Sequence, residues 1–510
     1  MKETLIQFSE IQAAWPLLEL LQLLPFVTAL ILWRVRTQSR AMIALSASVL
    51  EMLLALQLYY QFDLSTDKMQ FANQVDLLGL SYHVAVDGIS ISFVLLTALL
   101  SLLSVLFVIF RRLHQTSVLA IMALIQSLLM SQFVSVNLLW FVLMSILEMI
   151  ALGYLLYRWA TFVDAKPMII RYSQYMSVGI LLMLIGTFML GWNYSGQHGG
   201  DWSFDLYKLA LTPIEPAIAT FTFFALFYGL GIRIPIFPLH GWLPETIQHG
   251  NVAVAPMFLL GLKVGIFALL RFVFPIMPES VIEWHNIVII FSVIGIFYAA
   301  LLAMRQVNLR RLMAYAVISH TGILSIGLFT LHKQGFAGGI MLAINFGLAI
   351  SGLMFMIGLV WQRTNTASIA RLGGIFQYMP IVTIAFLISG LAIMGMPGTP
   401  GFDAVHLVLE SSIVEFGALV TIAAALGNVV AAGFLLFAFQ KAFLGEPSGD
   451  TSRWDTRPAR LTERAMALIV IVVILGMGFF SDLWLSLFDH SLNSLSNVYQ
   501  QLLNQQGGHS

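Results

Sequence analysis

Cysteine is absent from this 510-residue chain, and only 10% of its residues are charged. Without cysteine the chain cannot form a disulfide, a thiolate zinc site or a cysteine-held iron–sulfur cluster, and it has no cysteine nucleophile. Soluble domains carry roughly a quarter charged residues, so the low charge excludes a string of soluble domains. The 25 Lys and Arg residues balance the 25 Asp and Glu residues, so no net charge favours a nucleic acid as a partner.

Motifs for cofactors and phosphate groups are also missing. The chain has no Gly-x-Gly-x-x-Gly fingerprint, no loop ending in Gly-Lys-Ser or Gly-Lys-Thr, and no His-Glu-x-x-His sequence. Its histidines do not pair at ligand spacing, so we expect neither a metal ion nor a redox cofactor in this chain. Energy for any transport would then come from an ion gradient or a partner subunit, and whether the chain itself counts as an enzyme stays open.

Long apolar runs dominate what is present: 59% of residues are hydrophobic and the mean hydropathy is +0.89. About fourteen stretches reach the roughly 20 apolar residues that a membrane-spanning helix needs. The first run has no small-residue cleavage site after it, so we expect a retained span rather than a signal peptide. The sequence predicts an all-α polytopic integral membrane protein with spans over 14–34, 41–60, 87–110, 117–135, 137–160, 169–192, 217–239, 252–274, 283–304, 311–331, 336–360, 380–412 with a break, 415–444 and 465–488.

The distribution of cations predicts the orientation of these spans. Eighteen Lys and Arg residues fall in loops after odd-numbered spans and four fall on the opposite side. Because cytoplasmic loops carry an excess of Lys and Arg, we expect both termini on the non-cytoplasmic side. The remaining cations are Arg233, Lys263 and Arg271. Of these, Arg271 lies near a span end and is expected to extend to the interface.

Two spans contain sequences that a regular helix cannot accommodate. Pro235 and Pro238 interrupt the seventh span, and Pro397 and Pro400, with three neighbouring glycines, interrupt the twelfth. Proline removes a backbone donor, and bare backbone groups at membrane depth need burial in protein or a water-filled cavity. Paired interruptions indicate inverted repeats around a transport path. The alternative is that these residues only kink their helices.

Ionisable side chains lie inside the apolar runs: Glu148 in the fifth, Lys263 in the eighth, His320 in the tenth, and Arg233 before the first break. A carboxylate at mid-bilayer costs on the order of 3 kcal/mol, so Glu148 needs a partner, for which we predict Arg233. Lys, Glu and His can gain and lose protons as a proton path requires, whereas Arg keeps its charge. Lys263 is therefore the predicted central titrating group. The alternative is that each residue has a structural role: Glu148 as an anchoring acid, Lys263 as a structural cation and His320 as a packing residue.

At these residues the chain resembles the antiporter-like membrane subunits of respiratory complex I, most closely the chain M type, a family that includes the Mrp cation/proton antiporter subunits. The similarity is most specific in residues 82–90, 234–245, 262–272, 308–320 and 396–402. It implies fourteen helices, two inverted five-helix repeats, discontinuous helices 7 and 12, and proton translocation along a central Glu/Lys/His axis. It also implies four parts: helices 1–3 (1–116), the first repeat (117–274), the second repeat (283–444), and a cytoplasmic loop, helix 14 and polar tail (445–510).

The resemblance assigns roles to individual residues. Glu148, Lys263 and His320 match the family's helix 5 glutamate, helix 8 lysine and helix 10 histidine. Three positions depart from the family: its helix 7 lysine is Arg233 here, its helix 11 histidine falls on Asn345, and its charged group after the second break falls near Val405. The candidate replacements in the second half of the path are Asp403, His406 and Glu410.

The leading functional prediction is a proton-translocating subunit of an NADH:quinone oxidoreductase-type complex in the bacterial inner membrane, working with other membrane subunits. The alternative is an ion-coupling subunit of a related complex, for energy-coupled inorganic carbon uptake or Mrp-type Na⁺/H⁺ antiport. A third reading is a scaffold that has lost conduction, which the replacements at Arg233 and Asn345 favour.

Overall fold

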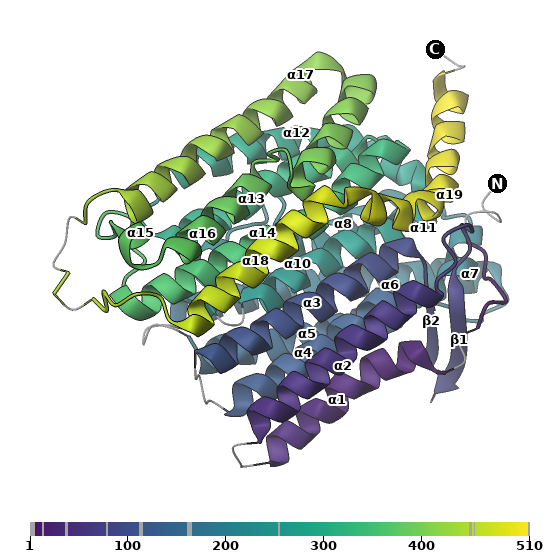
Figure 1. The fold of residues 1–510 in the computed structure, drawn as a ribbon. Helices are drawn as coiled ribbons and strands as arrows, with labels where there is room; N and C mark the ends of the chain where they lie inside the picture. The colour runs from purple at the N-terminus through teal and green to yellow at the C-terminus, as the bar shows by residue number, and fades with distance from the viewer. Residues whose placement is uncertain are drawn as a thin grey trace.

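The computed structural model describes residues 6–12, 15–35, 39–77, 80–111, 116–160, 166–252, 255–447, 451–452 and 454–507. The loop cations Arg36, Arg112 and Arg453 and the terminal Lys2 lie outside these ranges. The described chain is a bundle of long helices packed side by side, with both termini at the same end (Figure 1). Its helices are α1 (Leu17–Arg34), α2 (Arg40–Gln61), α3 (Gly88–Phe110), α4 (Thr116–Val134), α5 (Leu138–Arg158), α6 (Lys166–Gln197), α7 (Leu206–Leu211), α8 (Pro216–Arg233), α9 (Leu243–His249), α10 (Ala255–Ala268), the π-helix η3 (Leu269–Val273), α11 (Phe274–Ile276), α12 (Pro278–Met304), α13 (Leu309–Phe329), α14 (Lys333–Thr364), α15 (Ile375–Tyr378), α16 (Pro380–Ile393), α17 (Pro400–Phe439), the π-helix η4 (Gln440–Leu444), α18 (Leu461–Phe479) and α19 (Ser481–Gly507).

Among the described residues, 12 helices are long and apolar enough to cross a membrane. Two shorter apolar helices, Val118–Val134 and Pro380–Ile393, pack among them. The predicted all-α polytopic membrane fold is therefore confirmed. One segment, Pro400–Leu444, holds the thirteenth predicted span and the second part of the twelfth, whose first part is α16. It changes direction at Gly417, whose φ of 73° lies in the left-handed region that glycine adopts without a Cβ clash.

Both predicted helix breaks are present. Helix α8 ends at Arg233, and the chain stays non-helical until α9 begins at Leu243. The indole of Trp242 donates to the carbonyl of Ile232 (3.0 Å), which supplies a donor to the end of α8. In the second break, residues 394–399 separate α16 from α17. Gly395 and Gly398 there have φ of 66° and 82°, which explains the glycines among these prolines.

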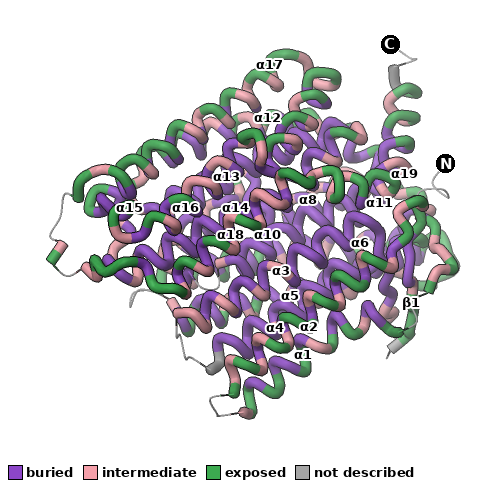
Figure 2. The backbone as a smooth tube through the Cα atoms, in the orientation of Figure 1, coloured by how far each residue is buried: buried purple, intermediate pink, exposed green. Residues whose placement is uncertain are grey.

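The interior of the bundle is formed by three helical segments that the other helices surround. The apolar windows of Ala255–Ile276, α13 and α14 are completely buried, whereas those of α2, α18 and the Pro400–Leu444 segment are only 28–33% buried. Figure 2 shows the same contrast between a buried centre and an exposed outer surface. A helix that is apolar all round and buried in protein, as α10 and α14 are, offers a site where an ionisable side chain is shielded from lipid.

Three elements at the end that carries the termini were not predicted. Strands β1 (Gln70–Leu77) and β2 (Leu80–Val86) form an antiparallel hairpin, and the short helix α7 lies near it (Figure 1). The expected polar tail is helix α19, and α18 ends at Phe479 rather than near 488. The apolar side of α19 packs on the bundle, and the hydroxyl of Tyr499 donates to the carbonyl of Phe274 (2.9 Å). Its one-sided apolar pattern is that of a surface helix, which a search for continuous apolar runs misses.

Candidate functional site

A buried ion pair links α5 to the end of α8. Glu148 and Arg233 are 0% and 3% exposed at their side chains, and a guanidinium nitrogen of Arg233 donates to Oε2 of Glu148. The same nitrogen donates to the carbonyl of Gly261 (3.1 Å), and the other terminal nitrogen donates to Oε1 of Gln132 (3.3 Å). The pairing predicted from the sequence is therefore present. Since α8 stops at Arg233, the break positions this guanidinium among three other helices.

Helix α10 approaches this pair through Gly261. A Cβ at that position would lie 2.8 Å from Oε1 of Glu148, so only a glycine lets the carboxylate lie against the helix. That oxygen has no hydrogen-bond partner among the described residues. A small pocket with room for about one water molecule adjoins the pair, lined by residues of α5, α6 and α10 and by Trp242. Space for water next to a carboxylate oxygen with a free lone pair is what proton delivery to Glu148 requires.

Lys263 lies two residues beyond Gly261 and faces a different helix. Its side chain is 5% exposed in a completely buried segment. Its Cε lies 3.6 Å from where a Cβ of Gly347 on α14 would be, and its ammonium nitrogen lies 6.0 Å from the centroid of the Phe346 ring. Among the described residues no carboxylate forms an ion pair with it. Lys263 is therefore a buried amine that has no carboxylate counter-charge in the described part of the chain.

The ring of Phe346 is near both Lys263 and His320. Its centroid is 4.8 Å from that of the His320 imidazole, at an interplanar angle of 75°. Nδ1 of His320 lies 2.9 Å from the carbonyl of Ala316. Because a carbonyl only accepts, Nδ1 is the donor in the neutral ring and Nε2 is the atom that can take up a proton. Nε2 has no hydrogen-bond partner in the described structure. Phe346 was not predicted, because an aromatic residue on an apolar helix gives no signal in the sequence.

Two asparagines hold the second helix break next to His320. Asn345 donates to the carbonyl of Ala392 (2.9 Å), and Asn428 donates to the carbonyl of Met394 (2.7 Å). These carbonyls lie at the end of α16, where helical donors are missing. The side-chain oxygens of both asparagines have no partner among the described residues. At the family's histidine position, Asn345 thus stabilises the break and leaves one acceptor free.

The three candidates for the second half of the path are placed differently. His406 and Glu410 are exposed on α17 and Asp403 is half-buried, whereas Val405 is buried. The described structure therefore does not bring these three side chains into the buried interior with His320. Their role in the path stays a prediction.

Arg271 does not extend to the interface, contrary to expectation. It is 6% exposed, and a guanidinium nitrogen donates to Oδ1 of Asp87 (2.5 Å) and to the hydroxyl of Ser90 (2.8 Å). Asp87 also caps α3 by accepting from the backbone N–H of Ser90. The ion pair thus joins α3 to η3, and a charged side chain is buried because a carboxylate neutralises it.

The buried ionisable side chains are called the ionisable row below: Glu148, Arg233, Lys263 and His320. Such a row beside two interrupted helices is typical of polytopic, antiporter-like membrane proteins. Comparisons with known proteins agree. The family described as NADH:quinone oxidoreductase/Mrp antiporter, TM, matches residues 135–432, and the chain belongs to this family. NADH-quinone oxidoreductase subunit M of Rickettsia typhi is 30% identical over 501 residues, covering 94% of this chain and 98% of that protein. Subunit M of Escherichia coli is 26% identical over 513 residues, covering 96% and 98%.

Solved structures show the same fold. A chain of respiratory complex I from Thermus thermophilus with bound NADH superposes with a TM-score of 0.84 at 26% identity, over 94% of this chain and 99% of that one. A chain of the Mrp complex from Dietzia sp. gives the same TM-score at 18% identity, over 95% of this chain and 97% of that one. The second likeness shows the fold alone.

Proposed function

We propose that this chain is the proton-translocating, antiporter-like membrane subunit of an NADH:quinone oxidoreductase-type complex, and that it conducts protons along the ionisable row. The observation that carries the proposal is the buried Glu148–Arg233 pair beside Gly261. Lys263, which has no ion-pair partner among the described residues, lies two residues further along the same helix. The similarity to subunit M proteins over almost the full length of both chains supports the assignment to this type of complex.

The charge state of Glu148 offers a physical link to Lys263. While Glu148 is ionised, it neutralises Arg233, which cannot release its own proton. When Glu148 takes up a proton, the positive charge of Arg233 is left uncompensated against α10. Like charges repel strongly where water is scarce, so the Lys263 ammonium is then favoured to lose its proton. Arg233 in place of a lysine thus acts as a fixed charge that passes the state of Glu148 to Lys263.

Phe346 gives this step a barrier. A proton that moves from Lys263 to Nε2 of His320 travels near this aromatic ring, and apolar constrictions control conduction by excluding water. We infer that Phe346 separates the two sides of the path until a movement of α14 admits water. Such a barrier prevents a passive leak, as coupling to a partner subunit requires.

We also propose a bacterial inner-membrane location with both termini on the non-cytoplasmic side, and the arrangement of the helices and cations supports this orientation. Both termini lie at one end of the bundle (Figure 1), as an even number of crossings requires. Arg34, Arg158 and Arg363 occupy the last turns of α1, α5 and α14, and clustered cations mark the cytoplasmic side. The four-part division at 1–116, 117–274, 283–444 and 445–510 is part of this proposal.

Purification of the affinity-tagged chain from its native membrane tests the proposal. Mass spectrometry of the intact complex should identify a quinone-reducing module together with other membrane subunits. A complex with only Mrp-type subunits, or with a zinc-containing carbonic-anhydrase-like subunit, would contradict the proposal and support one of the two related ion-coupling functions. Recovery of the chain alone, with no driven proton movement after reconstitution, would support a scaffold.

A further inference from the structure

A second buried carboxylate lies in the middle of α2, outside the ionisable row. Glu51 is 1% exposed, although α2 is an outer helix. Neither of its carboxylate oxygens has a hydrogen-bond partner among the described residues. Burying a carboxylate without a partner is costly, and ionisable residues within membrane spans commonly mark ion or proton sites. Glu51 was not singled out from the sequence, although it gives the same signal as Glu148: one acid within an apolar run.

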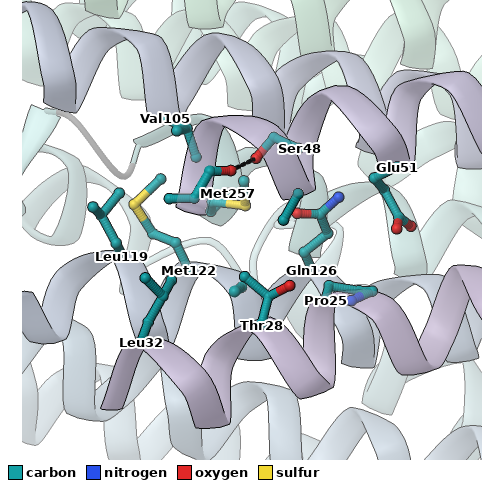
Figure 3. A pocket seen from close by; sticks show the side chains of 13 residues that line it. Pro25, Thr28, Leu32, Ser48, Glu51, Val105, Leu119, Met122, Gln126 and Met257 are labelled. Atoms are coloured by element: carbon teal, nitrogen blue, oxygen red, sulfur yellow. Dashed lines mark hydrogen bonds between the residues drawn. The ribbon is translucent and has the colours of Figure 1, made fainter. Parts of the chain in front are cut away.

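Glu51 lines a small pocket between α1, α2, α3, α4 and α10, with room for about one water molecule or one ion. Figure 3 shows Glu51, Gln126 and Pro25 toward one end of this pocket, and Leu32 and Leu119 at the other. Nε2 of Gln126 also lacks a hydrogen-bond partner among the described residues. A site with several unsatisfied polar atoms and space beside them is one that a water molecule or an ion can occupy.

The charge of Glu51 is not balanced by its surroundings. Of the 13 residues that line the pocket, no other is titratable. Helices α3 and α4 carry no charged residue. Besides Glu51, the charged residues of α1, α2 and α10 are Glu19, Arg34, Arg40 and Lys263, and none of these four lines the pocket. An ionised Glu51 therefore needs a positive charge that the described protein does not provide.

We propose that Glu51 is the carboxylate of a binding site for one monovalent cation, a proton or a sodium ion, in this pocket. One such cation makes the site electrically neutral, which suits a buried position. The pocket offers oxygen atoms of the kind that hard cations bind: the Glu51 carboxylate, the hydroxyls of Thr28 and Ser48, and the amide oxygen of Gln126.

This site is distinct from the proposed proton path and does not rest on it. Gln126 belongs to α4 and Met257 to the start of α10, and Lys263 lies further along the same helix. A cation at Glu51 could therefore be present whether or not the ionisable row conducts protons.

Carbodiimide labelling of the intact complex in native membranes tests the site. Dicyclohexylcarbodiimide is an apolar reagent that modifies protonated carboxyl groups in such environments, and mass spectrometry locates the modified residue. We expect labelling of Glu51 to decrease as the pH is raised, by roughly tenfold for each pH unit above the midpoint. Sodium chloride at constant pH and ionic strength should slow it relative to choline chloride if Na⁺ competes with the proton.

Each outcome assigns or overturns the site. Protection by both high pH and Na⁺ supports a sodium site, and protection by high pH alone supports a proton site. Labelling that is independent of pH and Na⁺, or no labelling under any condition, overturns the proposal, because the carboxyl group then does not exchange a cation. Gln126→Leu should shift the pH midpoint by removing the neighbouring amide. The matched control Gln57→Leu, at an exposed position of α2, should leave the midpoint unchanged.

Discussion

The Glu148–Arg233 ion pair allows a quantitative prediction about stability. Both side chains are almost completely buried, and removing one partner of such a pair leaves an uncompensated charge, which costs about 3–5 kcal/mol. The two single variants should not be equal. In Glu148→Gln the guanidinium cannot lose its proton and keeps its charge, whereas in Arg233→Gln the remaining carboxylate can be neutralised by a proton. We therefore expect Glu148→Gln to lower the free energy of unfolding more than Arg233→Gln does.

A double-mutant cycle measures the interaction itself. The free energy of unfolding of the wild type, the two single variants and the double variant would be determined in the same detergent by reversible chemical unfolding. The structure predicts a double variant more stable than Glu148→Gln, with a coupling energy of about 3 kcal/mol. A coupling energy below about 1 kcal/mol, the value for exposed pairs, would refute the reasoning, as would a larger loss in Arg233→Gln.

Three further predictions concern other parts of the structure. Gly261→Ala places a Cβ 2.8 Å from Oε1 of Glu148, so it should lower proton flux and lower the free energy of unfolding by about 1–3 kcal/mol. The control is Gly476→Ala, where an added Cβ meets no atom within 4 Å. Equal effects of the two substitutions would contradict the steric argument. Phe346→Ala should raise the passive proton leak several-fold in proteoliposomes, whereas Phe376→Ala, at an exposed position, should not. An unchanged leak in Phe346→Ala would exclude a barrier at Phe346. In the loop before α18, the hydrogen bond from Arg457 (2.8 Å) lowers the pKa of Asp455 to about 2, so this contact should persist as the pH falls until about 2. Arg457→Gln should return the pKa of Asp455, measured by NMR, toward about 4. An unchanged pKa would show that Arg457 does not cause the shift.

The sequence was sufficient for the helices, the two breaks and the acid–guanidinium pair, because long apolar runs, prolines and isolated charges are strong local signals. Contacts between residues far apart in the chain were harder to predict from the sequence. The pairing of Arg271 with Asp87 depends on α3 and η3 meeting in space, so a cation near a span end was misjudged. Phe346 and Asn428 gave no signal, because an aromatic ring or an amide acquires its role from the neighbours that packing supplies. The hairpin and α19 lack the continuous apolar runs by which membrane spans are found.

Proton flux through a Lys263 variant is the decisive test of conduction along the ionisable row. The complex carrying Lys263→Met would be reconstituted in proteoliposomes with a pH-sensitive dye, beside the wild type and the exposed control Lys208→Met, after intact assembly has been verified by native mass spectrometry. We expect that Lys263→Met assembles normally and loses driven proton flux, whereas Lys208→Met retains it. Undiminished flux in an assembled Lys263→Met complex would contradict the account.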